Sequence, residues 1–147
     1  MKKELFDKID ERYEMIPEAF GGPVPESEID EAEEELRVKL PEEYREFIRR
    51  YGSGGVGDAV ILGLRQAEFL STPSFVKETE AFRNDLPKEY SNMIVIGVDG
   101  AGNPIGFQPP DQTTFLLDHN FEGYVKLAVS FEDYLSKALS RKLGIHF

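Results

Sequence analysis

The spacing of apolar residues changes near residue 52, and this change limits the possible folds more than any other feature of the sequence. Before that point, apolar residues recur every three or four positions, as on one face of an α-helix. Residues 3–14, 27–36 and 40–51 are predicted to be helices on this basis. After it, short apolar runs alternate with Gly, Pro, Asn and Asp, as in strands joined by turns. Helices followed by a strand meander indicate an α+β fold.

The second half of the chain is predicted to form a central, mostly antiparallel sheet flanked by helices. The strands expected from the apolar runs are 60–62, 93–98, 105–108, 113–117 and 124–129. Residues 75–85 and 130–143 have helical spacing, and Ser130 is predicted to cap the later helix. Ser27, with Asp30 three positions later, is interpreted as a capping box at the start of the second helix.

The composition is that of a folded domain. The chain has 147 residues, of which 40% are hydrophobic and 12% aromatic, enough to bury a core. No linker or repeat divides it, so a single domain over residues 1–147 is expected. The absence of Cys excludes disulfides and thiolate metal sites. There is no secretory signal in the first fourteen residues and no apolar run long enough to cross a bilayer, so a cytoplasmic location is expected.

The charge predicts a protein partner. A net charge of −11 disfavours direct binding to nucleic acid or to an anionic membrane, because both need clustered Lys and Arg. Acidic surfaces instead steer association with cationic ones, although surface acids can also serve solubility alone. Between Lys88 and Lys126 the sequence has no Lys or Arg. The acids in this span are Glu89, Asp99, Asp111, Asp118 and Glu122.

The run Gly52-Ser53-Gly54-Gly55-Val56-Gly57 matches the G-x-G-x-x-G pattern of a dinucleotide-binding turn. That turn needs a strand before the glycines and a helix after them. Here a predicted helix precedes and a strand follows, and the carboxyl end of a helix repels phosphate. Gly52 is therefore interpreted as a left-handed cap that ends the helix, with Gly54 and Gly55 turning the chain. No cofactor is expected.

Three other sequence patterns are candidates for a metal site or a catalytic site. The stretch Asp99–Asn103 is interpreted as a hairpin turn, because a calcium loop needs a longer series of ligands ending in Glu. Asp118 and His119 are adjacent on a predicted strand and point to opposite faces. With His146 as the only other histidine, a multi-histidine metal site is excluded. No Ser lies in a G-x-S-x-G context. No catalytic residue and no metal site are predicted, and the chain is not expected to be an enzyme.

Four residues of the third predicted helix fall on one stripe. Tyr44, Phe47, Ile48 and Tyr51 have the spacing i, i+3, i+4 and i+7. The stripe is predicted to pack in the core against the sheet. An aromatic row that binds a ligand is the alternative.

Three segments carry a family resemblance in their order and spacing. The first, EIDEAEEELRVKLPEEYREFIRRYGSGG, joins an acidic helix, Leu-Pro, an aromatic helix and a glycine turn. The second, VIGVDGAGNPIGF, is a glycine-rich hairpin, and the third, FLLDHNFEGYVKLAVSFEDYLSKAL, supplies strands and a closing helix. Together they resemble the SUKH superfamily, in its Smi/Knr branch, over roughly residues 26–140, with a helix and linker before them in residues 1–25. The matching positions are Leu40, Pro41, Tyr44, Tyr51, Gly52, Gly54, Gly55, Gly97, Asp99, Gly100 and Gly102.

The resemblance implies an α+β domain without enzymatic activity or cofactor. Bacterial members are typically immunity proteins that neutralise polymorphic or contact-dependent toxins, many of them nucleases, whereas fungal members are regulatory scaffolds. An immunity protein that binds a basic toxin domain is therefore expected, and a scaffold that binds intracellular proteins or peptides is the alternative. The candidate partner-binding residues are Asp99, Asp111, Asp118 and Glu122.

Overall fold

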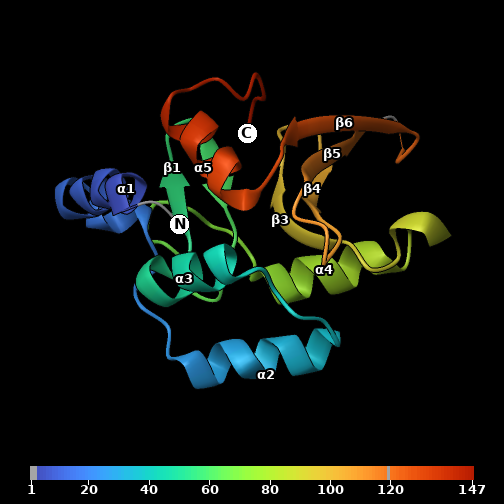
Figure 1. Cartoon of the computed structure of the whole chain (residues 1–147), viewed down its shortest axis with the longest axis horizontal. Helices are drawn as coiled ribbons and strands as arrows, with labels where there is room; N and C mark the ends of the chain where they lie inside the picture. The colour runs from blue at the N-terminus through green and yellow to red at the C-terminus, as the bar shows by residue number, and fades with distance from the viewer. Residues whose placement is uncertain (1–2, 119) are drawn as a thin grey trace.

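A computed structural model describes residues 3–118 and 120–147 and shows an α+β fold (Figure 1). The first part is helical, with α1 (Lys3–Met15), α2 (Glu26–Leu36) and α3 (Glu42–Tyr51). The rest contains β1 (Gly54–Val56), β2 (Ala59–Ile61), α4 (Phe75–Arg83), β3 (Ile94–Val98), β4 (Pro104–Phe107), β5 (Thr114–Asp118), β6 (Gly123–Ala128) and α5 (Phe131–Leu139). The predicted order of helices, strand meander and closing helix is confirmed.

The strands form two antiparallel sheets. The larger has the order β3-β4-β5-β6, and β1 pairs with β2 in a separate hairpin. The hairpin reaches the larger sheet where the Leu62 N–H donates to the Ile96 carbonyl oxygen at 2.8 Å. In Figure 1 the larger sheet stands on one side of the molecule, with α4 beneath it and α3 and α5 beside it. The core lies between this sheet, the helices and the hairpin.

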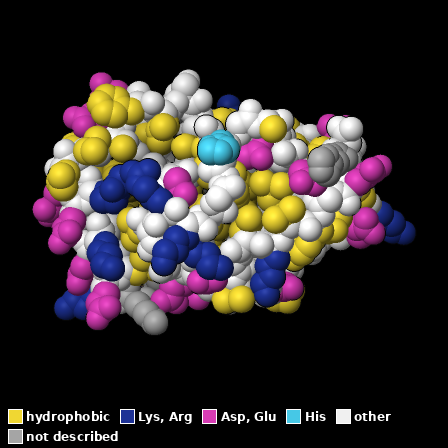
Figure 2. Space-filling model, turned by 90° about the horizontal axis from the view of Figure 1, so that it is seen from above, with side chains coloured by type: hydrophobic (Ala, Val, Ile, Leu, Met, Phe, Trp, Pro, Cys, Tyr) yellow, Lys and Arg dark blue, Asp and Glu magenta, His cyan; other side chains and the backbone are white. Residues whose placement is uncertain are grey.

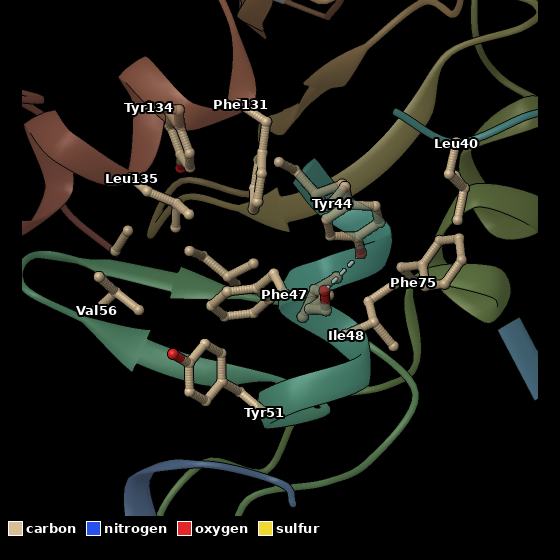
Figure 3. Packing of buried hydrophobic residues seen from close by; sticks show 14 of the residues in the cluster. Leu40, Tyr44, Phe47, Ile48, Tyr51, Val56, Phe75, Phe131, Tyr134 and Leu135 are labelled. Carbon is tan, nitrogen blue, oxygen red and sulfur yellow. Dashed lines mark hydrogen bonds between the residues drawn. The ribbon is translucent and has the colours of Figure 1, made fainter. Parts of the chain in front are cut away.

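The stripe on α3 forms the centre of that core (Figure 3). Tyr44, Phe47, Ile48 and Tyr51 are all buried, so the prediction of a core stripe is confirmed. The rings of Tyr44 and Phe47 both lie nearly perpendicular to the Phe131 ring from α5, at 5.1 and 5.8 Å between centroids. The Tyr44 hydroxyl donates to the Leu62 carbonyl oxygen at 2.6 Å, which satisfies the buried phenol and ties α3 to the segment after β2.

The glycine run follows a different course from the one expected. Gly52 has φ of +75°, as predicted for a residue that ends a helix, but its ψ of −42° lies outside the left-handed helical region. Gly54 and Gly55 do not turn the chain: they lie in β1 and pair with Ile61 and Val60 of β2. The ring of Phe20 packs directly on Gly54. Any larger residue would clash there, since a Cβ would lie 2.4 Å from that ring.

Two helix ends also differ from prediction. Helix α2 begins at Glu26 rather than after Ser27, because Pro25 takes the N-cap position in extended conformation and its carbonyl oxygen accepts from Glu28 and Ile29. The predicted capping box is therefore wrong. Helix α5 ends at Leu139 rather than near residue 143. Its Ser130 cap is confirmed, since the Ser130 hydroxyl accepts from the Asp133 N–H at 3.0 Å.

The buried tyrosines predict a loss of stability at alkaline pH. Burial raises the pKa of Tyr44 and Tyr134 above the usual value for tyrosine, because the phenolate would lose its hydration. The unfolded chain titrates at about pH 10, so their contribution is complete below that pH and is lost above it, at about 1.4 kcal/mol per pH unit for each group. Tyr44→Phe should cost about 1 kcal/mol at pH 8 and flatten this alkaline decline. Urea unfolding followed by circular dichroism between pH 8 and 11.5 measures both effects, and an unchanged alkaline slope would contradict the assignment.

Candidate protein-binding surface

The turns of the larger sheet place three of the four candidate acids at one end. In an antiparallel meander, alternate turns share an end. Asp99 in the β3–β4 turn, Asp118 at the end of β5 and Glu122 just before β6 therefore lie at the same end. Asp111 lies in the β4–β5 loop at the opposite end. The sheet thus brings Asp99, Asp118 and Glu122 to one end and separates Asp111 from them.

A groove of about 390 Å³ adjoins this end of the sheet. One wall is the sheet face, with Leu116 from β5 and Val125 and Leu127 from β6. The other wall is the segment after α5, which contributes Leu143 and Ile145. Figure 2 shows hydrophobic side chains gathered on this side of the molecule, with a histidine beside them and both acidic and basic side chains around them.

Asp99 and Asp118 also line the groove and add negative charge to it. The Asp99 carboxylate organises its own turn, because its Oδ1 atom accepts from the N–H groups of Ala101 and Asn103 at 3.0 and 2.8 Å. The Gly100 N–H donates to the His146 carbonyl oxygen at 2.6 Å and holds residues 143–146 against this turn. Asp99 therefore has a structural role, and its charge remains at the mouth of the groove.

Asp111 has a different environment. Its Oδ1 atom accepts from the Thr113 N–H at 2.9 Å, and hydrogen bonds from Thr113, with a smaller effect of the Lys126 charge, lower the pKa of the Asp111 carboxyl. Lys126 pairs with Phe115, whose side chain packs in a small cluster with Met93 and Leu117 on the face of the sheet opposite the groove. Asp111 thus shapes a loop next to a cation, away from the other three acids.

Three acids of α2 form ion pairs within the fold. Asp30 and Glu33 form ion pairs with Arg45 of α3, at 2.9 and 2.7 Å. The Glu28 carboxylate accepts hydrogen bonds from both terminal nitrogens of Arg65, at 2.7 and 3.0 Å. These pairs fasten α2 to the rest of the molecule. The helix with the densest negative charge is therefore a poorer candidate for partner recognition than the end of the sheet.

The apolar part of this surface was not predicted from the sequence. Val125, Leu127, Leu143 and Ile145 come from a strand and a later segment that meet only in the folded chain. A partial signal exists in the alternation of Val125 and Leu127 with Tyr124 and Lys126, which gives β6 one apolar face. Within residues 3–118 and 120–147, no group of three or more His, Asp or Glu side chains could hold a metal ion. The Asp118–His119 pair cannot be placed in full, because His119 lies outside the described residues.

The fold and the glycine-rich hairpin agree with a comparison against known families. The sequence profile of the SMI1 / KNR4 family (SUKH-1) matches residues 23–137. The chain belongs to this family. The match begins just before α2 and ends within α5, so α1 lies outside it, as the sequence resemblance indicated for residues 1–25. A comparison with curated protein sequences finds no match. Of the helices in the described part of this SUKH-1 chain, none has the length and apolar character needed to cross a membrane.

The SUKH motif positions build the scaffold. Leu40, Pro41, Tyr44 and Tyr51 are buried. Gly97 allows close packing of β2 on β3, since a Cβ there would lie 3.2 Å from the Val60 carbonyl oxygen. Of the apolar residues of the groove, Leu116, Val125 and Leu127 lie within the matched residues 23–137, and Leu143 and Ile145 lie after them.

Proposed function

We propose that this SUKH-1 domain is an immunity protein that neutralises a cognate toxin by stoichiometric binding, without catalysis. The toxin surface that it binds carries Lys and Arg, as a nuclease domain does. The observation that supports this proposal is the location of Asp99, Asp118 and Glu122 at one end of the sheet, within a span of sequence that contains no Lys or Arg.

Acids gathered at one end of the sheet can inhibit a nuclease by electrostatic attraction. A nuclease must attract phosphates with cationic side chains. An inhibitor with carboxylates at its binding surface can occupy the same cations and block access of nucleic acid. The net charge of −11 adds long-range attraction, which raises the association rate and weakens as salt increases.

The direct test is to capture the partner in the native host with the tagged chain and then to produce that partner alone. We expect a one-to-one complex, growth arrest by the isolated partner, and relief of the arrest when this chain is co-expressed. A captured partner that binds stoichiometrically but has no toxicity would instead make this domain a regulatory scaffold. Turnover of the partner or of a small molecule by the chain would contradict the proposal as a whole.

The contribution of the acidic end is tested by Glu122→Lys, because Glu122 is exposed in the β5–β6 connection. We expect the variant to associate with the captured partner about threefold to tenfold more slowly at low salt and to show a weaker salt dependence. The melting temperature should change little, as for most surface substitutions. Stopped-flow association rates at several ionic strengths provide the measurement.

The matched control for this variant is Glu31→Lys. Glu31 is exposed on α2 and the substitution changes the net charge by the same amount. Wild-type association by Glu31→Lys, together with slow association by Glu122→Lys, localises the effect to the end of the sheet. Equal slowing by the two variants would mean that only total charge matters and would remove the acidic end from the interface.

A further inference from the structure

We propose that the groove between β6 and residues 143–146 is a docking site for an extended, cationic segment of the partner. Apolar side chains of that segment lie against Val125 and Leu127, and its Lys or Arg side chains lie near Asp99 and Asp118. This inference rests on the proposed binding function and assigns that function to one surface and one kind of ligand.

Strand β6 is the exposed edge of the larger sheet. The outer edge of β3 is covered, because Thr79 Oγ1 accepts from the Val95 N–H at 2.9 Å and the Ile96 carbonyl oxygen accepts from Leu62. In the described part of the chain, β6 pairs with β5 alone. Every second residue of an edge strand directs its backbone N–H and C=O away from the sheet. An extended segment can therefore pair with this edge.

Helix α5 restricts the position of such a segment. Lys137 Nζ donates to the Leu127 carbonyl oxygen at 3.0 Å, and the Val129 N–H donates to Asp133 Oδ2 at 3.1 Å. These bonds engage the backbone at the end of β6. The start of the strand, from Gly123 to Lys126, is left beside the groove.

Each of the two faces of β6 carries an exposed side chain. Val125 is 41% exposed and lies on the groove side, whereas Tyr124 is 49% exposed and stacks on Phe115 on the opposite side, at 4.8 Å between ring centroids. A partner residue that covers Val125 removes apolar surface from water on the groove side alone. Adjacent positions on one strand therefore distinguish docking in the groove from docking on the other face.

The charge around the groove selects a cationic occupant. Asp99 and Asp118 lie in its lining, and Glu122 lies in the adjacent connection. Basic groups also lie nearby. His146 is on the groove wall, Lys137 binds the Leu127 carbonyl oxygen at the far end of β6, and the exposed Arg141 and Lys142 precede the wall segment, whereas Lys126 is on the opposite face of β6. The three acids are at the other end of β6, next to the turns, so that end is where cations of a partner are attracted. A second copy of this chain carries the same charge of −11 and would be repelled. The occupant that fits is an extended segment in which apolar residues alternate with Lys or Arg.

A synthetic peptide tests the site without the natural partner. The probe is a fluorescein-labelled peptide of about nine residues that alternates Val and Lys, long enough to span β6. Its two comparison peptides alternate Val with Glu and Ser with Lys. We expect saturable binding of the Val/Lys peptide by fluorescence anisotropy, and binding about tenfold or more weaker for each of the others. In ¹⁵N NMR spectra, the perturbed amides should lie at Leu116, residues 123–127 and residues 143–146.

Two variants test whether the peptide binds in the groove. Val125→Arg should weaken binding of the Val/Lys peptide about tenfold, because it places a cation in the groove. Tyr124→Arg, which adds the same charge at the adjacent position on the other face, should change affinity by less than about twofold. Equal losses in both variants, equal binding of the Ser/Lys peptide, NMR perturbations at the exposed Met15 and Phe69 instead, or a dimer in sedimentation would each overturn the proposal.

The groove and the immunity function can fail separately. Peptide binding in the groove, together with a captured partner that has no toxicity, would support the groove and contradict the immunity function. A toxin that Val125→Arg binds and neutralises as well as the wild-type chain does would support the immunity function and contradict the groove.

Discussion

Phe47→Ala is expected to lower the free energy of unfolding by about 3–5 kcal/mol, because it removes a ring from the centre of the core. Phe47 has no exposed surface, and its ring lies 5.2 Å from that of Tyr51 and 5.8 Å from that of Phe131, measured between centroids. The contact with Phe131 joins α3 to α5. Removal of the Phe47 ring would therefore leave a cavity between two helices, which the movement of a single side chain cannot fill. Urea unfolding followed by far-ultraviolet circular dichroism measures the loss.

The control is Phe69→Ala, which deletes the same side chain at a position that is 66% exposed. The free energy of unfolding should then change by no more than about 0.5 kcal/mol. A loss below about 1 kcal/mol for Phe47→Ala would show that α3 does not form the centre of the core.

Gly52→Val should lower the free energy of unfolding about as much as Phe47→Ala does, for two reasons. Gly52 has φ of +75°, a conformation that a β-branched residue adopts at a cost of about 1–3 kcal/mol. A Cβ at this position would also lie 2.1 Å from the Gly22 carbonyl oxygen, so the segment before α2 would have to move. With this overlap added, we expect a loss of about 3–5 kcal/mol in the same urea experiment.

Gly102→Val separates the two causes. Gly102 has φ of +87°, but no other group lies within 4 Å of the position of its Cβ. This variant should show the backbone cost alone, about 1–3 kcal/mol. Equal losses at the two positions would mean that the contact with Gly22 contributes nothing.

The sequence predicted the elements whose spacing is regular over several turns or strands. The stripe from Tyr44 to Tyr51 is an example, because a helix that packs on one side must repeat apolar residues at that spacing. The β1–β2 hairpin was missed in part, because β1 is formed by Gly54, Gly55 and Val56, and glycine carries no side chain from which a strand could be read. Its formation depends on tertiary contacts with Phe20 and with β2.

The two misplaced helix ends have the same kind of cause. Ser27 and Asp30 have the spacing of a capping box, but Pro25 already supplies the extended N-cap, so the helix begins before Ser27. At α5, the apolar residues continue to Leu143, but Arg141 has φ of +54° and turns the chain away. Leu143 contributes to the groove rather than to the helix.

The candidate site was predictable in charge but not in shape. A span without Lys or Arg can be read directly from the sequence, and strand order then determines which of its acids meet. The groove depends on contact between β6 and residues 143–146. The sequence gives no local sign of that contact, because it is made by packing and by the bond from Gly100 to His146. Of the SUKH motif positions, Asp99 and Gly100 line the groove, but the motif does not include the residues 143–146 that form its other wall.

Hydrogen–deuterium exchange of the complex tests directly whether the partner docks at the end of the sheet, because it shows which backbone amides the partner covers. The chain would be measured by mass spectrometry alone and with the captured partner at saturation. We expect slower exchange at residues 99–103, 116–118, 120–127 and 143–146, with unchanged exchange in α2. Protection confined to α1 and α2, with the sheet end exchanging as in the free chain, would contradict this prediction.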